Sequence, residues 1–285
     1  MNHLDMLHSA VSRVILQRTA SERMPTMQTT PTPLAATLLG TGEPAVVLVP
    51  GWCGDRSVFD DLVAGLGSRR RALSLDLPAH GDSPDTGGDF TTDDVIDSVV
   101  AALDDARIDQ VVPVLLSHAG WAGIGLRRRL GARVPGLVFL DWMVLGTPPG
   151  FADALSGIQS PAWAQVRAGL AGMWTSGLDN ARLLAYVASM AGYGRAHWAR
   201  AGREISAGFA EHPVPLAAVE ALQPCQALHL YAQPSDDAVL RGQEEYSRAH
   251  PWFRVERLDA RSHFPMFEDA GTIVERIERF VRTLG

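Results

Sequence analysis

The sequence predicts an α/β fold in which a mostly parallel, doubly wound sheet carries an inserted helical cap. Six short apolar runs recur along the chain, at 45–52, 71–81, 111–118, 136–144, 225–234 and 253–263. Most of them are apolar throughout rather than alternating, which is typical of strands that are covered on both faces. Helical patterns at 91–108, 121–132 and 269–285 lie between or after these runs, and such alternation favours a doubly wound sheet.

The stretch 146–220 breaks this alternation. It contains no convincing strand, several helical patterns and several large aromatic residues, among them Trp163, Trp174, Tyr193 and Trp198. Because it lies between the strand expected at 136–144 and the next one expected at 225–234, we expect a helical cap over the strand ends, where α/β sheets bind ligands. A helical flank of the core is the alternative. The expected core is then 28–145 and 221–285, and residues 1–27 form an N-terminal extension with helical spacing of apolar residues.

Composition excludes several classes of function. The net charge of −7 argues against nucleic acid as a partner. A helix that spans a membrane needs about 18 consecutive apolar residues, and no apolar run in the sequence is that long. All 25 Lys and Arg residues are Arg, so Schiff-base chemistry and a lysine base are excluded. Two cysteines build neither a disulfide framework nor a metal pattern. We therefore expect a cytoplasmic protein; its oligomeric state is left open.

The run "VVPVLLSHAGWAG" (111–123) stops at Ser117 and continues as a helix of small residues. A strand, a serine and a small-residue helix are typical of the nucleophile elbow of an α/β-hydrolase fold. The position two residues before the serine, which is usually small, is Leu115. The question is therefore whether Ser117 attacks a substrate or only positions one.

A base and an acid complete the expected site. His263 follows the last strand, from which a histidine can reach back to the elbow, and it needs a carboxylate to hold its tautomer. Asp236 (or its neighbour in "AQPSDD") and Asp141 in "FLDWMV" are both candidates, and spacing does not separate them. Backbone N–H groups of Trp52 and His118 are expected to form the oxyanion site. His80, in "PAHGDSP", is interpreted as a turn residue.

A set of short motifs then carries a more specific resemblance. "VLVPGWCGD", "SHAGW", "LDWMVLGTPPGF", "GMW", "GREI", "YAQP", "AHPWF" and "SHFP" occur in this order. The set resembles the cofactor-free dioxygenases that open 3-hydroxy-4(1H)-quinolones, over roughly residues 40–283 and including the cap. The resemblance implies O₂ as co-substrate, no metal or other cofactor, and release of carbon monoxide with an N-acylanthranilate.

The resemblance also implies residue roles. His263 is similar to the family's base and Asp141 to its acid, which favours Asp141 over Asp236. Ser117 corresponds to a serine that hydrogen-bonds the substrate. Trp52 and His118 then line the former oxyanion site, and Trp174 matches a cap tryptophan that faces the substrate.

Two departures from the family pattern concern the substrate. Gly54 and Leu116 stand where relatives can carry histidine, so both positions lose a polar side chain and Gly54 is expected to make space. We expect the pocket to accept a longer 2-alkyl chain, such as 2-heptyl; a 2-methyl or unsubstituted quinolone is the alternative. Two other functions stay open: a serine hydrolase using Ser117 and His263 with either acid, and a non-catalytic protein that binds a small aromatic ligand.

Overall fold

The computed structural model describes residues 31–284, so the N-terminal extension expected over 1–27 lies outside the described residues. Within them seven strands form one sheet in the order β1-β3-β2-β4-β5-β6-β7. β1 pairs antiparallel with β3, and every other neighbouring pair is parallel. The strands are β1 (Ala36–Leu39), β2 (Ala45–Val49), β3 (Ala72–Leu75), β4 (Val111–Leu116), β5 (Gly136–Leu140), β6 (Gln226–Tyr231) and β7 (Phe253–Arg257).

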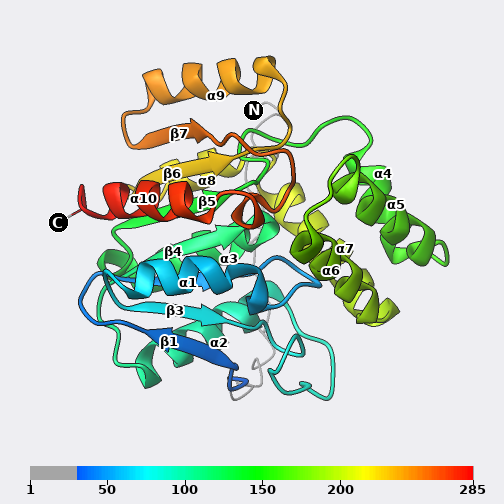
Figure 1. The fold of residues 1–285 in the computed structure, drawn as a ribbon, viewed down its shortest axis with the longest axis horizontal. Helices are drawn as coiled ribbons and strands as arrows, with labels where there is room; N and C mark the ends of the chain where they lie inside the picture. Colours follow the sequence, from blue (N-terminus) through cyan, green and yellow to red (C-terminus); the bar gives the residue numbers. More distant parts are fainter. Residues whose placement is uncertain (1–30, 285) are drawn as a thin grey trace, which may run out of the picture. The chain divides into compact units, whose positions relative to one another are not determined.

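Helices cover both faces of this sheet (Figure 1). One face is covered by α1 (Asp60–Gly67) and α10 (Ala270–Val281), which lie side by side. The other face packs against α2 (Thr92–Asp105), α3 (Gly120–Leu130) and α8 (Pro215–Glu220), and α9 (Asp237–Ala249) lies next to β7. The expected doubly wound α/β fold is therefore confirmed.

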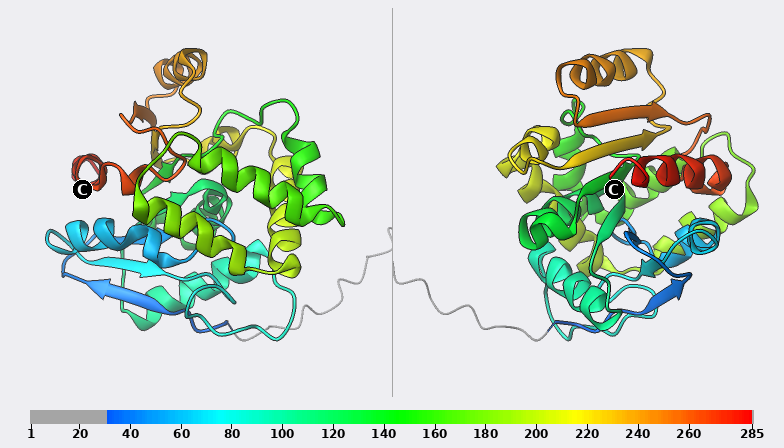
Figure 2. Two further views of the ribbon diagram at one scale, coloured as in Figure 1. Left: turned by 45° about the vertical axis from the view of Figure 1, so that its right-hand side comes forward. Right: turned by 90° about the vertical axis from the view of Figure 1, so that its left-hand side faces the viewer.

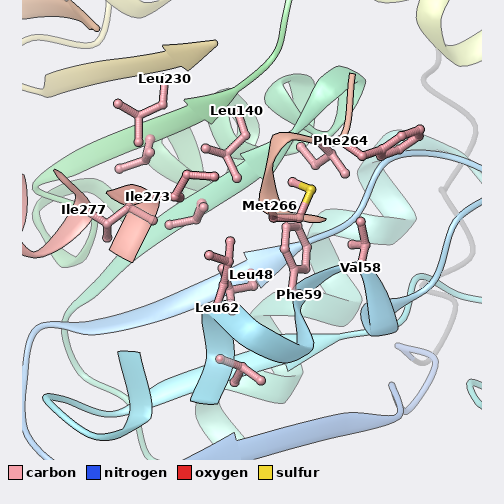
Figure 3. Close-up of a cluster of buried hydrophobic side chains, with 14 of the residues drawn as sticks. Leu48, Val58, Phe59, Leu62, Leu140, Leu230, Phe264, Met266, Ile273 and Ile277 are labelled. Carbon is pink, nitrogen blue, oxygen red and sulfur yellow. The ribbon is translucent and has the colours of Figure 1, made fainter. Parts of the chain in front are cut away.

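The buried side chains divide into two clusters, one on each face of the sheet. Figure 3 shows the first, in which Leu48 and Leu140 of the central strands meet Leu62 of α1 and Ile273 of α10. These side chains are almost completely shielded from solvent, and burial of each contributes about 1.5–3 kcal/mol. The same cluster continues into the inner face of the cap, so the cap and the core share one apolar interior.

The cap consists of four helices inserted between β5 and β6. They are α4 (Phe151–Gln159), α5 (Trp163–Thr175), α6 (Ala181–Ser189) and α7 (Arg195–Glu211), and they lie beside the carboxyl ends of the parallel strands (Figures 1 and 2). Helix α8, which the sequence analysis assigned to the cap, packs with the core because Leu216 and Val219 are fully buried there.

Polar contacts attach α7 to the loop before α2. Arg200 donates to Asp89 at 2.8 Å, and Glu204 accepts the backbone N–H of Thr92 at 2.7 Å. The guanidinium of Arg200 also lies 3.9 Å from the centre of the Phe90 ring, an arrangement that is attractive when desolvated. These contacts hold the cap against the strand ends that carry the candidate site.

Candidate active site

Four residues at the carboxyl ends of adjacent parallel strands have a left-handed backbone. Cys53 follows β2, Ala79 follows β3, Ser117 follows β4 and Asp141 follows β5, with φ values of 60°, 58°, 53° and 50°. Each such conformation costs a non-glycine residue about 1–3 kcal/mol, and such positions gather at functional sites. Four of the five non-glycine residues with positive φ among residues 31–284 therefore lie at this edge of the sheet, the fifth being Arg107, which indicates that this edge is the site.

The chain turns sharply at Ser117 although the large residue Leu115 stands two positions before it. Leu115 fits because Gly123, the fourth residue of α3, has no side chain: a Cβ there would lie 2.0 Å from a methyl carbon of Leu115. The small residue that the motif lacks on the strand is thus supplied by α3. Within residues 31–284 the hydroxyl of Ser117 makes no hydrogen bond that would mark it as an activated nucleophile.

His263 and Asp141 form a dyad. Nδ1–H of His263 donates to Oδ2 of Asp141 at 2.7 Å. The other carboxylate oxygen accepts the backbone N–H groups of Ala232 and Gln233, at 2.6 and 2.9 Å. The carboxylate is completely buried, so these three donors satisfy a charge that burial would otherwise penalise. With Nδ1 as donor, Nε2 of His263 is the free acceptor, as a general base requires.

The other candidate acids lie elsewhere. Asp236 is exposed and caps α9, where its side chain accepts the backbone N–H of Ala238. Asp237 is paired with Arg257 at 2.9 Å. Neither is bonded to His263, so the structure brings the base together with the carboxylate at the end of β5.

The loop after β2 is held by a histidine whose role the sequence analysis missed. Nε2 of His80 accepts the backbone N–H of Cys53 at 3.1 Å, and its Nδ1–H donates to the carbonyl of Pro78 at 2.7 Å. Burial lowers the pKa of His80 to about 4, so it is neutral near pH 7. His80 therefore lies in the turn after β3, as expected, and in addition its buried ring supports the loop beside Trp52. Only its burial distinguishes it, and no pattern in the sequence indicates that burial.

His118, directly after Ser117, lies among aromatic rings. Its ring centre is 5.5 Å from that of Phe151 and 5.7 Å from that of Phe209. Burial lowers its pKa to about 3, and the nearby His263 acts in the same direction. The imidazole is therefore neutral near pH 7, and it is close enough to His263 for the two rings to influence each other.

Two tryptophans flank the dyad and the oxyanion loop. The ring of Trp174, in α5, stacks on His263 with 5.6 Å between centres and 18° between planes. Trp52 stacks on Phe90 with 5.7 Å between centres and the same interplanar angle. A flat aromatic wall thus lies directly over the base.

The two positions that depart from the family pattern have different surroundings. Leu116 is almost fully buried in the cluster that extends into the cap. At Gly54 a Cβ would lie 2.2 Å from the hydroxyl oxygen of Tyr186 in α6. The expectation that Gly54 makes space in the pocket is therefore wrong, because Tyr186 fills the space that the missing side chain leaves.

Two absences among the described residues bear on other classes of site. Residues 31–284 contain no group of three or more His, Cys, Asp and Glu side chains that could hold a metal ion. Among the same residues, no helix is both long and apolar enough to cross a membrane.

Comparison with known proteins agrees with this geometry. Residues 46–276 match the α/β hydrolase family. The chain is 33% identical to the 2-heptyl-3-hydroxy-4(1H)-quinolone dioxygenase of Mycobacteroides abscessus, over 79% of this chain and 85% of that protein. It is 29% identical to the 1H-3-hydroxy-4-oxoquinoline 2,4-dioxygenase of Pseudomonas putida, over 84% of this chain and 92% of that one.

A solved structure is similar over nearly the same length. It is that of AqdC with its product, described as the basis for recognition and ring cleavage of the Pseudomonas quinolone signal. Its TM-score is 0.83 at 31% identity, and the match covers 87% of this chain and 96% of that one. This chain therefore belongs to the 3-hydroxy-4-quinolone dioxygenases of the α/β hydrolase family.

Proposed function

We propose that this protein is a dioxygenase that cleaves the ring of a 2-alkyl-3-hydroxy-4(1H)-quinolone with O₂, giving an N-acylanthranilate and carbon monoxide. The observation that carries the proposal is the dyad under an aromatic wall: Nδ1–H of His263 donates to Asp141 at 2.7 Å, and Trp174 stacks over the imidazole. A base beside a flat apolar surface suits deprotonation of a planar bicyclic substrate.

His263 takes the proton of the substrate's 3-hydroxyl through Nε2, and Asp141 stabilises the resulting imidazolium. The electron-rich anion then reacts with O₂ at C2, the peroxide closes on C4, and the ring opens with loss of the C3 carbon as carbon monoxide. The reaction needs no cofactor, because the substrate anion supplies the electrons.

The remaining positions bind the substrate. The backbone N–H groups of Trp52 and His118 stabilise negative charge on oxygen, and Ser117 hydrogen-bonds the substrate without attacking it. Trp174 covers the ring system. Leu116 contributes to the apolar wall, and Gly54 acts indirectly by admitting Tyr186.

The substrate carries a long 2-alkyl chain, with 2-heptyl as the test case. The relative at 33% identity is named for the 2-heptyl compound, whereas the relative at 29% is named for a quinoline without the chain. The apolar lining of the cap supports the same choice, since Leu116, Leu155 and Ile158 belong to one cluster. Each buried methylene contributes about 0.8 kcal/mol, so burying two of six added carbons favours the 2-heptyl substrate about tenfold in kcat/KM.

In the primary test, the metal-stripped protein is incubated with 2-methyl- or 2-heptyl-3-hydroxy-4(1H)-quinolone, in the presence and in the absence of air. Substrate absorbance and released carbon monoxide are followed. We expect ring opening with carbon monoxide only in air, and a higher kcat/KM for the 2-heptyl compound. No consumption of either substrate overturns the dioxygenase, and equal efficiencies overturn only the choice of chain length.

A serine hydrolase is the second candidate, because the left-handed Ser117 at the strand end has the geometry of a nucleophile elbow. Ser117→Ala separates the two functions. The dioxygenase should keep substantial turnover, whereas a hydrolase with Ser117, His263 and Asp141 should lose almost all esterase activity. His263→Ala impairs both and does not discriminate.

We propose that the protein acts in the cytoplasm. Its partners are a small aromatic substrate and O₂, and it binds neither nucleic acid nor a membrane. The two cysteines are free and buried, which fits a reducing compartment. The net charge of −7 supports the exclusion of nucleic acid.

A further inference from the structure

Trp142 connects the end of β5 to the elbow. It directly follows Asp141, and its indole Nε1–H donates to Nδ1 of His118 at 3.1 Å. Room for the indole comes from Gly120 in the first turn of α3, where a Cβ would lie 2.3 Å from the ring of Trp142. The backbone N–H of Trp142 donates to Nε2 of His229 at 3.2 Å, so both its backbone and its side chain are fixed.

This contact determines which nitrogen of His118 carries the proton. A neutral imidazole has one donor and one acceptor nitrogen. Because Nδ1 accepts from the indole, the proton is on Nε2. Within residues 31–284 no side chain or carbonyl accepts from that nitrogen. The donor is therefore available to a ligand.

The position of His118 indicates which ligand atoms it can reach. His118 and Trp52 both border a void of about 10 Å³, the size of one water molecule, on the side of the sheet that α2 and α3 cover, so the two residues are neighbours. His118 also lies close enough to His263 for the charge of one to lower the pKa of the other. His118 thus neighbours the oxyanion loop and lies within electrostatic range of the base.

We propose that Trp142 is a positioning residue that fixes His118 as a neutral Nε2–H donor, and that this donor stabilises negative charge on oxygen during ring cleavage. The second clause rests on the proposed function; the first does not. A neutral donor adds to the backbone N–H groups without competing with His263 for the substrate's proton. His118 then acts through its side chain as well as its backbone.

The tautomer is tested directly by nitrogen NMR of the full-length protein labelled with ¹⁵N-histidine at pH 7. Long-range proton–nitrogen correlations distinguish Nδ1–H, Nε2–H and charged imidazoles, and the His118 signals are those that His118→Gln removes. We expect the Nε2–H form in the wild type and a mixture in Trp142→Phe. An Nδ1–H or charged His118 in the wild type overturns the proposal, whatever substrate the enzyme turns over.

Kinetics test the role in the reaction. Removing one oxyanion donor costs about 10²–10³-fold in kcat in other enzymes. We expect His118→Leu to lower kcat by about that factor with little change in KM, and His118→Gln, which keeps a donor near the Nε2 position, to recover part of it. Trp142→Phe should lower kcat about tenfold. Equal kcat in His118→Leu and the wild type overturns the catalytic clause.

Trp121 supplies the matched control. Its indole is buried against Trp142 at 4.9 Å between ring centres, and its N–H has no partner among the described residues. Trp121→Phe therefore removes an indole N–H from the same aromatic cluster without touching His118. If Trp121→Phe and Trp142→Phe lower kcat equally, the effect is one of packing and the proposal is overturned.

Discussion

Asp141→Asn perturbs the proposed base through a single atom. The carboxylate accepts two backbone N–H groups on Oδ1 and the imidazole of His263 on Oδ2. An asparagine keeps its amide oxygen toward the two backbone donors, so its NH₂ group faces Nδ1 of His263. Nδ1 must then accept, and the proton of the neutral imidazole moves to Nε2. His263 can no longer receive the proton of the substrate's hydroxyl.

The expected loss follows from the contribution of a general base, which is about 10²–10⁴-fold. We therefore expect kcat for the 2-heptyl substrate at pH 7 to fall by that factor, or about 3–5 kcal/mol in activation free energy. The deficit should shrink as the pH rises, because a substrate that ionises in solution no longer needs the base. Carbon monoxide release is the assay.

Asp236→Asn is the control, since Asp236 caps α9 at the surface and asparagine caps equally well. It should leave kcat unchanged. A kcat for Asp141→Asn within twofold of the wild type refutes the assignment of the dyad. A loss that persists unchanged at alkaline pH refutes the reason given for it.

Two further predictions concern stability. Burial lowers the pKa values of His80, His118 and His229 to about 4, 3 and 4, so below pH 6.5 the unfolded chain binds protons that the folded chain does not. The free energy of unfolding, measured by urea denaturation, should be highest above pH 6.5 and should be lower at pH 5 by about 2 kcal/mol per imidazole. An equal free energy of unfolding at the two pH values would contradict the burial of these imidazoles. Gly123→Ala should cost about 1–3 kcal/mol by overpacking against Leu115. Leu115→Val should relieve part of that cost in a double-mutant cycle, whereas additive losses would show that the two positions are independent.

The sequence predicts the fold well because most of the six parallel strands are apolar and buried throughout, with β7 (FRVER) as the exception. All six appear in the structure. The seventh strand, β1, pairs only with β3 at the sheet edge and is largely exposed, so it has neither a buried run nor an alternating pattern. Such an edge strand is specified by its partner more than by its own residues.

The acid of the dyad could not be chosen from spacing because both candidates follow strands that are neighbours in the sheet. The structure uses the two strand ends differently. The loop after β6, where Asp236 is found, donates the backbone N–H groups of Ala232 and Gln233 to Asp141. The contribution of that loop is made by its backbone, which carries no residue-specific signal in a single sequence.

Contacts between segments that are far apart in the chain could not be predicted from the sequence either. His80 supports the backbone of Cys53 from 27 residues away, and Tyr186 of the cap fills the space beside Gly54. Glycine at position 54 is compatible with an open pocket or with a neighbour that fills it. Only the path of the cap decides between these two outcomes.

The pair Asp141–Trp142 explains why an aspartate followed by a tryptophan is useful at the end of β5. Consecutive residues bind the same nitrogen, Nδ1, of two different imidazoles, but with opposite polarity. The carboxylate accepts from His263 and leaves its Nε2 free to receive a proton. The indole donates to His118 and leaves its Nε2 as a donor. A serine hydrolase requires only the first of these contacts, because its oxyanion site is made of backbone N–H groups. On our proposal, one strand end therefore produces both a base for the substrate's hydroxyl and a donor for the oxygen anion that follows.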